Sequence, residues 1–237
     1  MRYRRADGGF SETSLDRVVA ADVVHGLPVR EFRWYKGRLH YSGWYWCAKS
    51  GRLVVYESRL ELARIMLADF DPDVACLAAQ PFLLTGVDDG RVRRHVPDLM
   101  LLGADGGVTV VDVKAASRLA DPAVKAQFAW TRQVCAEGGW GFEPWSGTDP
   151  QILTNVRFLA GYRRSSVIAD GLIPEVLEMA GRQPTIGAIE RALTDRHRQE
   201  LVRPVVLHLL WCGRLRADLR LPLGADTRVD LAGKARG

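Results

Sequence analysis

Residues 94–114, RHVPDLMLLGADGGVTVVDVK, decide the fold that this sequence predicts. Two apolar runs flank the loop of residues 103–107, GADGG. A five-residue, glycine-rich connection between two such runs is typical of a β-hairpin. Placing Leu102 opposite Val108 gives both runs a regular antiparallel register. The stretch therefore predicts two paired strands with a fixed register.

Each strand of this hairpin carries an acid where a buried strand normally has none. The register brings Asp98 opposite Asp112, and directly opposed residues have Cβ atoms about 5 Å apart. Two carboxylates this close repel each other unless a cation or a proton lies between them. Lys114 lies two residues beyond Asp112 and so points to the same face. The second strand is otherwise apolar on both faces, which is typical of a central strand. The hairpin predicts a metal site with a basic residue beside it.

The upstream segment YESRLELARIMLADFD, residues 56–71, predicts a helix that Pro72 ends. Ser58 and Glu61 have the spacing of a capping box at its start. Glu61 therefore has two interpretations, as half of that box or as a third acid turned toward the hairpin. The helix by itself favours the cap, and Glu57 is an alternative third acid.

Further elements complete a mixed α/β domain over residues 1–165. Aromatic strands are expected at 31–35 and 38–48, a strand at 74–84 broken at Gln80-Pro81, a turn at 88–90, helices at 122–136 and 155–162, and a strand at 141–145. His95 lies three residues before Asp98, on the other face of a regular strand, so we expect no catalytic role for it.

Residues 166–237 predict a second, smaller domain. Three helices are expected at 174–180, 186–193 and 204–212, and a β-hairpin at 215–221 and 227–231. Pro174 and Pro204 suit first-turn positions, Thr185 suits an N-cap, and Gly213 ends the third helix. Three helices followed by a hairpin is the layout of a winged-helix domain.

The charge distribution favours a polyanionic partner. The net charge is +5, and residues 163–237 carry 13 basic and nine acidic residues. A solvated surface is the alternative to phosphate contact here. We predict DNA contacts from six basic residues: Arg196, Arg198, Arg203, Arg214, Arg216 and Lys125.

Membrane insertion and secretion are not indicated. The longest apolar run is shorter than the roughly 20 residues of a membrane span. No apolar core follows the charged N-terminus, and the four cysteines are scattered. These features predict a cytoplasmic protein, nucleoid-associated if the source is prokaryotic.

Pro97-Asp98, Asp112-Val113-Lys114 and the helix acid Glu61 together resemble the PD-(D/E)xK nuclease superfamily. Seven segments are similar to the TnsA-type endonuclease subunit of heteromeric transposases. In order along the chain they are YESRLE, FDPDV, AAQPF, RHVPDLML, VVDVK, NVRFLAGYRR and RPVVLHLLWCGRLRADLRLPL. The similarity spans roughly residues 40–232. Some members of that family have Gln where this chain has Asp112.

The resemblance implies a restriction-endonuclease-like core and a metal-dependent cut in double-stranded DNA at transposon ends. Asp98 would be the main ligand for Mg²⁺, or for Mn²⁺ in its place, with Asp112, Glu61 and the backbone carbonyl of Val113 completing the site. Lys114 would orient or help to deprotonate the attacking water.

The implied partners are a DDE-type transposase subunit, which cuts and joins the other strand, and an AAA+ ATPase regulator. Two alternatives stay open. One is a non-catalytic DNA-binding adaptor of a transposition complex, and the other is a stand-alone restriction or repair nuclease of the same fold.

Overall fold

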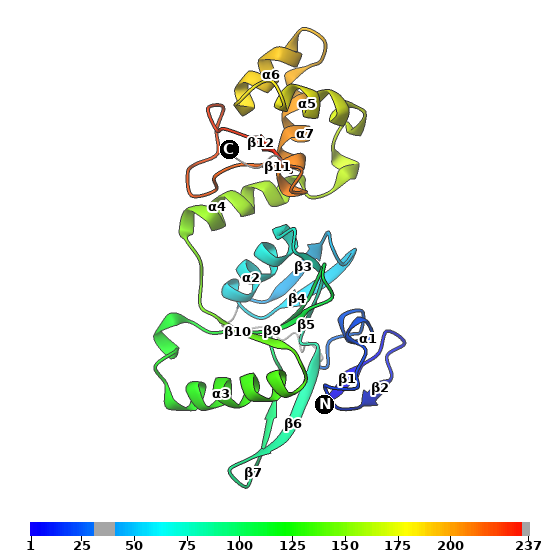
Figure 1. The fold of residues 1–237 in the computed structure, drawn as a ribbon, viewed down its shortest axis with the longest axis vertical. Helices are drawn as coiled ribbons and strands as arrows, with labels where there is room; N and C mark the ends of the chain where they lie inside the picture. Colours follow the sequence, from blue (N-terminus) through cyan, green and yellow to red (C-terminus); the bar gives the residue numbers. More distant parts are fainter. Residues whose placement is uncertain (31–40, 234–237) are drawn as a thin grey trace. The chain divides into compact units, whose positions relative to one another are not determined.

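The structure is a computed structural model that describes residues 1–30 and 41–233. The chain forms two compact units (Figure 1). The first comprises Met1–Asp69 and Asp73–Gly147, and the second comprises Phe70–Pro72 and Thr148–Gly237. The boundary thus follows Gly147, whereas the sequence placed it after residue 165. The helix expected to close the first domain belongs to the second unit.

The main sheet of the first unit has the strand order β10-β9-β8-β5. Its strands are β5 (Val74–Ala79), β8 (Leu99–Gly103), β9 (Val108–Val113) and β10 (Gly141–Trp145). β8 pairs antiparallel with both β5 and β9, and Leu102 lies opposite Val108 as predicted. β10 runs parallel to β9, so β9 is central, which confirms the expectation from its apolar sequence.

A second sheet has the order β2-β1-β6-β7, and a separate hairpin pairs β3 with β4. The bounds are β1 (Arg2–Arg4), β2 (Phe10–Glu12), β3 (Gly43–Cys47), β4 (Arg52–Tyr56), β6 (Phe82–Asp88) and β7 (Arg91–His95). Gln80, with φ +46°, separates β5 from β6 at the predicted break. The aromatic strand predicted at 31–35 and the start of the next lie outside the described residues.

Helices flank these sheets. They are α1 (Ala20–Val24), α2 (Arg59–Phe70), the 3₁₀ turn η1 (Ala116–Arg118) and α3 (Pro122–Glu137). The Asp121 carboxylate caps α3 by accepting a hydrogen bond from the Ala123 N–H. Trp130 and Cys135 of α3 pack in one buried cluster with Met100 and Val110 of the main sheet.

The second unit is mainly helical. Its elements are α4 (Pro150–Leu159), η2 (Ala160–Tyr162), η3 (Ser165–Val167), η4 (Asp170–Leu172), α5 (Ile173–Ala180), α6 (Ile186–Thr194), α7 (Gln199–Trp211), β11 (Leu215–Arg216) and β12 (Asp230–Leu231). Thr185 caps α6 as predicted, because its Oγ1 accepts a hydrogen bond from the Ala188 N–H.

The prediction for Pro204 was wrong. It lies inside α7, which begins one turn earlier, at Gln199, rather than in the first turn. The preceding residues QELVR are mostly good helix formers, so the helix extends back past the proline. The final hairpin also forms, but β11 and β12 share only two residue pairs.

Candidate active site

The candidate site is centred on Asp98, which immediately precedes β8. Its Oδ2 accepts a 2.7 Å hydrogen bond from the Val113 N–H. The pKa of Asp98 is raised to about 7, mainly by burial and also by the nearby charges of Glu61 and Asp112, although the Val113 N–H and Lys114 oppose the rise. All four predicted catalytic side chains therefore lie close enough to share one electrostatic environment.

Glu61 has both of the roles that the sequence left open. Its backbone N–H donates to Ser58 Oγ at 3.0 Å, and the Ser58 hydroxyl donates to Glu61 Oε1 at 3.0 Å. Its Oε2 accepts a 2.8 Å hydrogen bond from the Glu57 N–H. Burial raises the pKa of Glu61, and Lys114 lowers it. Ser58 thus caps α2 with Glu61 as its partner in the capping box, and Glu61 is also the helix acid whose charge acts on Asp98.

Asp112 makes an unexpected contact with His95. His95 Nε2 lies 2.9 Å from Oδ1 and 2.7 Å from Oδ2 of Asp112. The Asp112 side chain is 2% exposed and that of His95 is 20% exposed. The expectation that His95 faces away was wrong because β7 ends at His95 and β8 begins only at Leu99. The alternation of side chains between the two faces of a strand does not continue through residues 96–98. Pro97 indicates this break in the sequence, because proline interrupts a regular strand.

Lys114 directly follows β9 and is half-buried. Its backbone N–H donates to the Trp145 carbonyl at 2.9 Å, which anchors it beside β10. Arg64 of α2 makes a two-pronged ion pair with Glu143 of β10, at 3.1 and 2.7 Å. Arg64 lies one turn after Glu61, so this ion pair fixes the start of α2 relative to the strand beside Lys114.

The residues fit a divalent cation only in part. Across residues 1–30 and 41–233, no group of three or more His, Cys, Asp or Glu side chains is arranged to hold a metal. Both Asp112 oxygens contact His95, and both Glu61 oxygens accept hydrogen bonds. Asp98 and Glu61 nevertheless concentrate negative charge in a buried place, which a hard cation would relieve.

The predicted DNA-contacting residues are divided between the units. Lys125 is exposed on α3 of the first unit. In the second unit Arg196, Arg198, Arg214 and Arg216 are exposed. Arg203 instead lies 3.3 Å from the buried carboxylate of Glu190. This ion pair makes Arg203 the least available of the set for a phosphate.

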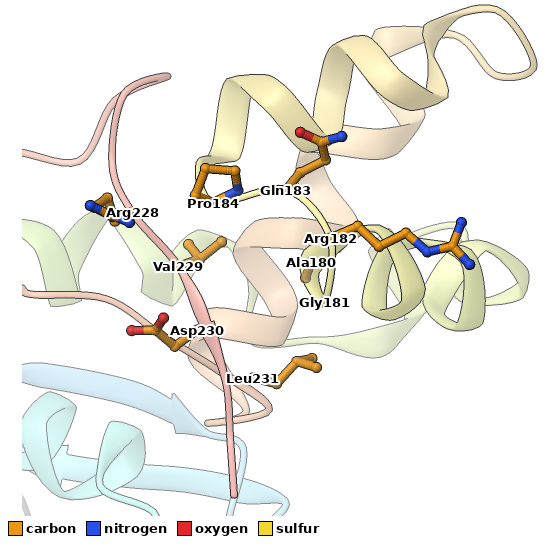
Figure 2. Close-up of a pocket in the computed structure, with 9 residues that line it drawn as sticks. All are labelled: Ala180, Gly181, Arg182, Gln183, Pro184, Arg228, Val229, Asp230 and Leu231. Atoms are coloured by element: carbon orange, nitrogen blue, oxygen red, sulfur yellow. The ribbon is translucent and has the colours of Figure 1, made fainter. Parts of the chain in front are cut away.

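A separate pocket of about 200 Å³ lies in the second unit, between the end of α5 and β12 (Figure 2). Arg182, Arg228 and Asp230 are the charged residues on its lining. Figure 2 shows their side chains pointing in different directions rather than converging on one point. The pocket contains no predicted catalytic residue, so it does not identify a site for the proposed chemistry.

No protein family model matches this sequence, and a search of curated proteins finds no match. In the described part of the chain, no helix has both the length and the apolar character needed to cross a membrane. Function must therefore be argued from the site itself.

Proposed function

We propose that the chain is the Mg²⁺-dependent endonuclease subunit of a heteromeric transposase, of the TnsA type. The observation that carries the proposal is the environment of Asp98. This mostly buried carboxyl lies beside Glu61, Asp112 and Lys114, and its pKa is raised to about 7. Strongly shifted carboxyl groups that share a site with a lysine are typical of catalytic centres.

The order of elements supports a restriction-endonuclease-like core. The chain forms helix α2 first and then the antiparallel strands β5, β8 and β9. Helix α3 follows and connects β9 to β10, which is parallel to β9. The right-handed βαβ connection is the expected link between two parallel strands. Helices α5 to α7 followed by β11 and β12 support a winged-helix-like second unit.

The chain's own residues suggest how a phosphodiester would be hydrolysed. Asp98 and Glu61 would hold Mg²⁺ or Mn²⁺, and Val113 could add its carbonyl. When bound, the metal would neutralise negative charge on the phosphate and make water more acidic. Lys114 would place its positive charge beside the attacking water, where it stabilises developing hydroxide. While Asp112 is bound by His95, it would help to hold β9 in place beside these groups. If the contact with His95 were broken, the Asp112 carboxylate would become a further metal ligand.

The partners follow from the resemblance. The proposed substrate is double-stranded DNA at transposon ends, where this chain would cut one strand. A DDE-type transposase subunit would cut and join the other, under an AAA+ ATPase regulator. The exposed arginines of the second unit are the candidate phosphate contacts.

The test is nicking of supercoiled plasmid by the full chain in Mg²⁺ or Mn²⁺, with and without a co-expressed transposase. Lys114→Met keeps most of the side-chain volume and removes the charge, so we expect cleavage to fall more than about a hundredfold. Lys49→Met, in the same unit but away from Asp98, is the matched control. Equal nicking by wild type and a folded Lys114→Met variant would overturn the proposal.

One observation favours a non-catalytic adaptor as the second candidate. His95 occupies both oxygens of Asp112, and the described residues hold no ready-made group of three ligands. An adaptor would bind duplex DNA but show no Mg²⁺- or Mn²⁺-dependent shift in melting temperature. A nuclease would show that shift and lose it in Asp98→Asn.

A further inference from the structure

The hairpin of β6 and β7 extends from the edge of the second sheet of the first unit. We call residues 84–95 the β6–β7 ribbon. β6 pairs with β1 through Phe82 and Leu83, whereas the ribbon pairs β6 with β7 from Leu84–His95 out to Asp88–Arg91. Asp89 and Gly90 at its tip both have positive φ, as a tight two-residue turn of primed type requires. Figure 1 shows the two strands extending past α3.

The ribbon has one anchored face. Leu84 is buried, and Gly86 approaches the ring of Trp130 on α3 so closely that an added Cβ would lie 3.1 Å from it. Arg93 makes an ion pair with Asp88 across the strands on the same side. The contacts of Leu84 and Gly86 hold this face of the ribbon against the first unit, and the ion pair links its two strands.

The opposite face points into solvent and has an unusual composition. It carries Thr85 and Arg94 as one cross-strand pair and Val87 and Val92 as the next. Val87 is 71% exposed and Val92 is 65% exposed. This cross-strand pair stabilises the hairpin itself but covers no core residue, so its outer surface is available to a binding partner.

The shape and charge of this face fit duplex DNA. The two strands lie about 4.8 Å apart. The major groove, about 12 Å wide, admits a two-stranded ribbon. The outward face carries the cation Arg94, Asp88 is already paired on the anchored face, and the exposed acid Asp89 lies in the turn at the tip. Valine and threonine methyl groups can contact the thymine methyl, and arginine can bind guanine.

The ribbon is also continuous with the acidic site. His95, next to Arg94, binds Asp112, and Asp98 follows Arg94 by four residues, a reach of at most about 14 Å. We propose that the β6–β7 ribbon enters the major groove of duplex DNA beside the bond cut at Asp98 and reads the bases there. This inference rests on the proposed function and names the element that would select the cleavage site.

The experiment compares full-length variants on a 40-base-pair duplex in a binding assay, in an Asp98→Asn background so that the DNA stays intact. We expect Arg94→Ala to weaken binding about tenfold, the loss of one good contact. Arg17→Ala removes an exposed arginine of the same unit that is outside residues 84–95 and is paired with Asp16, and it should change the affinity less than twofold.

A second measurement addresses base reading. Wild type and Val92→Ser, both with Asp98 intact, cut a library of duplexes with randomised sequence, and the cut sites are sequenced. We expect Val92→Ser to change the preferred bases within a few pairs of the cut while its melting temperature stays within about 2 °C of wild type.

The outcomes separate the two proposals. If wild type neither binds nor cuts duplex DNA, the proposed function fails, and this inference fails with it. If wild type binds and cuts while Arg94→Ala and Val92→Ser behave identically to it, the ribbon inference alone is overturned. A photo-crosslinker at position 92 that attaches to a co-purified protein and not to the duplex would also overturn it.

Discussion

Two acids of the first unit, the buried Asp69 and the mostly buried Asp98, differ in what surrounds them. Asp69, at the end of α2, accepts hydrogen bonds from the Tyr45 hydroxyl (2.8 Å), the Cys47 thiol (3.2 Å) and the N–H groups of Ala48 (3.1 Å) and Lys49 (3.0 Å). Within the described residues, the Asp98 carboxylate accepts one hydrogen bond and lies beside two further acids. A buried acid with a full set of donors ties elements together, whereas one among other acids is prepared to bind a cation or a proton.

The strongest test of this contrast is Asp98→Asn. We expect plasmid nicking to fall by at least about a thousandfold, because an amide is a poor ligand for Mg²⁺ and carries no charge. Stability should be unchanged or higher at pH 8, because an uncompensated buried charge is removed. Nicking and urea denaturation of the same preparation check both expectations, and a large loss of stability would contradict the assignment.

Asp69→Ala should instead reduce stability. It leaves buried donors of the β3–β4 hairpin without an acceptor, so we expect the free energy of unfolding to fall by about 3–5 kcal/mol. Urea denaturation measures this loss. The exposed turn residue Asp105 gives the control, and Asp105→Ala should cost less than about 1 kcal/mol. If Asp69→Ala proved as stable as the control, Asp69 would not be a structural anchor.

The raised pKa of Asp98 predicts a particular dependence of stability on pH. Between about pH 4 and pH 7, the folded protein keeps a proton on Asp98 that the unfolded chain has released. Stability contributed by this group is therefore present at low pH and is lost as the pH rises to about 7, by about 4 kcal/mol in total.

Denaturation curves of wild type and Asp98→Asn at pH 5 and pH 8 isolate this effect from other titrating groups. The wild type should lose more stability than the variant over that range, and added Mg²⁺ should reduce the difference. An equal change in stability between pH 5 and pH 8 for the two proteins would show that the pKa of Asp98 is not raised.

The smallest expected effect concerns the contact between His95 and Asp112. His95→Ala removes the donor from a carboxylate that is 2% exposed, so we expect a loss of about 2 kcal/mol in stability. His95→Gln keeps a donor and should recover more than half of that loss. Equal stability of the two variants would mean that the hydrogen bond contributes little.

Local patterns in the sequence predicted the elements that depend on local physics. The glycine-rich loop and the apolar runs were enough for the β8–β9 register, and the spacing of Ser58 and Glu61 was enough for the cap of α2. The contact of His95 with Asp112 could not be predicted, because it depends on how the chain turns between β7 and β8. The helical extension before Pro204 was missed because a proline signals a helix start more often than an interior position.

The parallel pairing of β10 with β9 has a consequence for folding during synthesis. Until Gly141–Trp145 has left the ribosome, β9 is an open edge with the sequence VTVVDV, and such apolar edges pair with other chains. Fragments that stop before residue 141 should therefore aggregate, even though they contain Glu61, Asp98, Asp112 and Lys114. The acids of the candidate site would thus be synthesised before the strand that protects them.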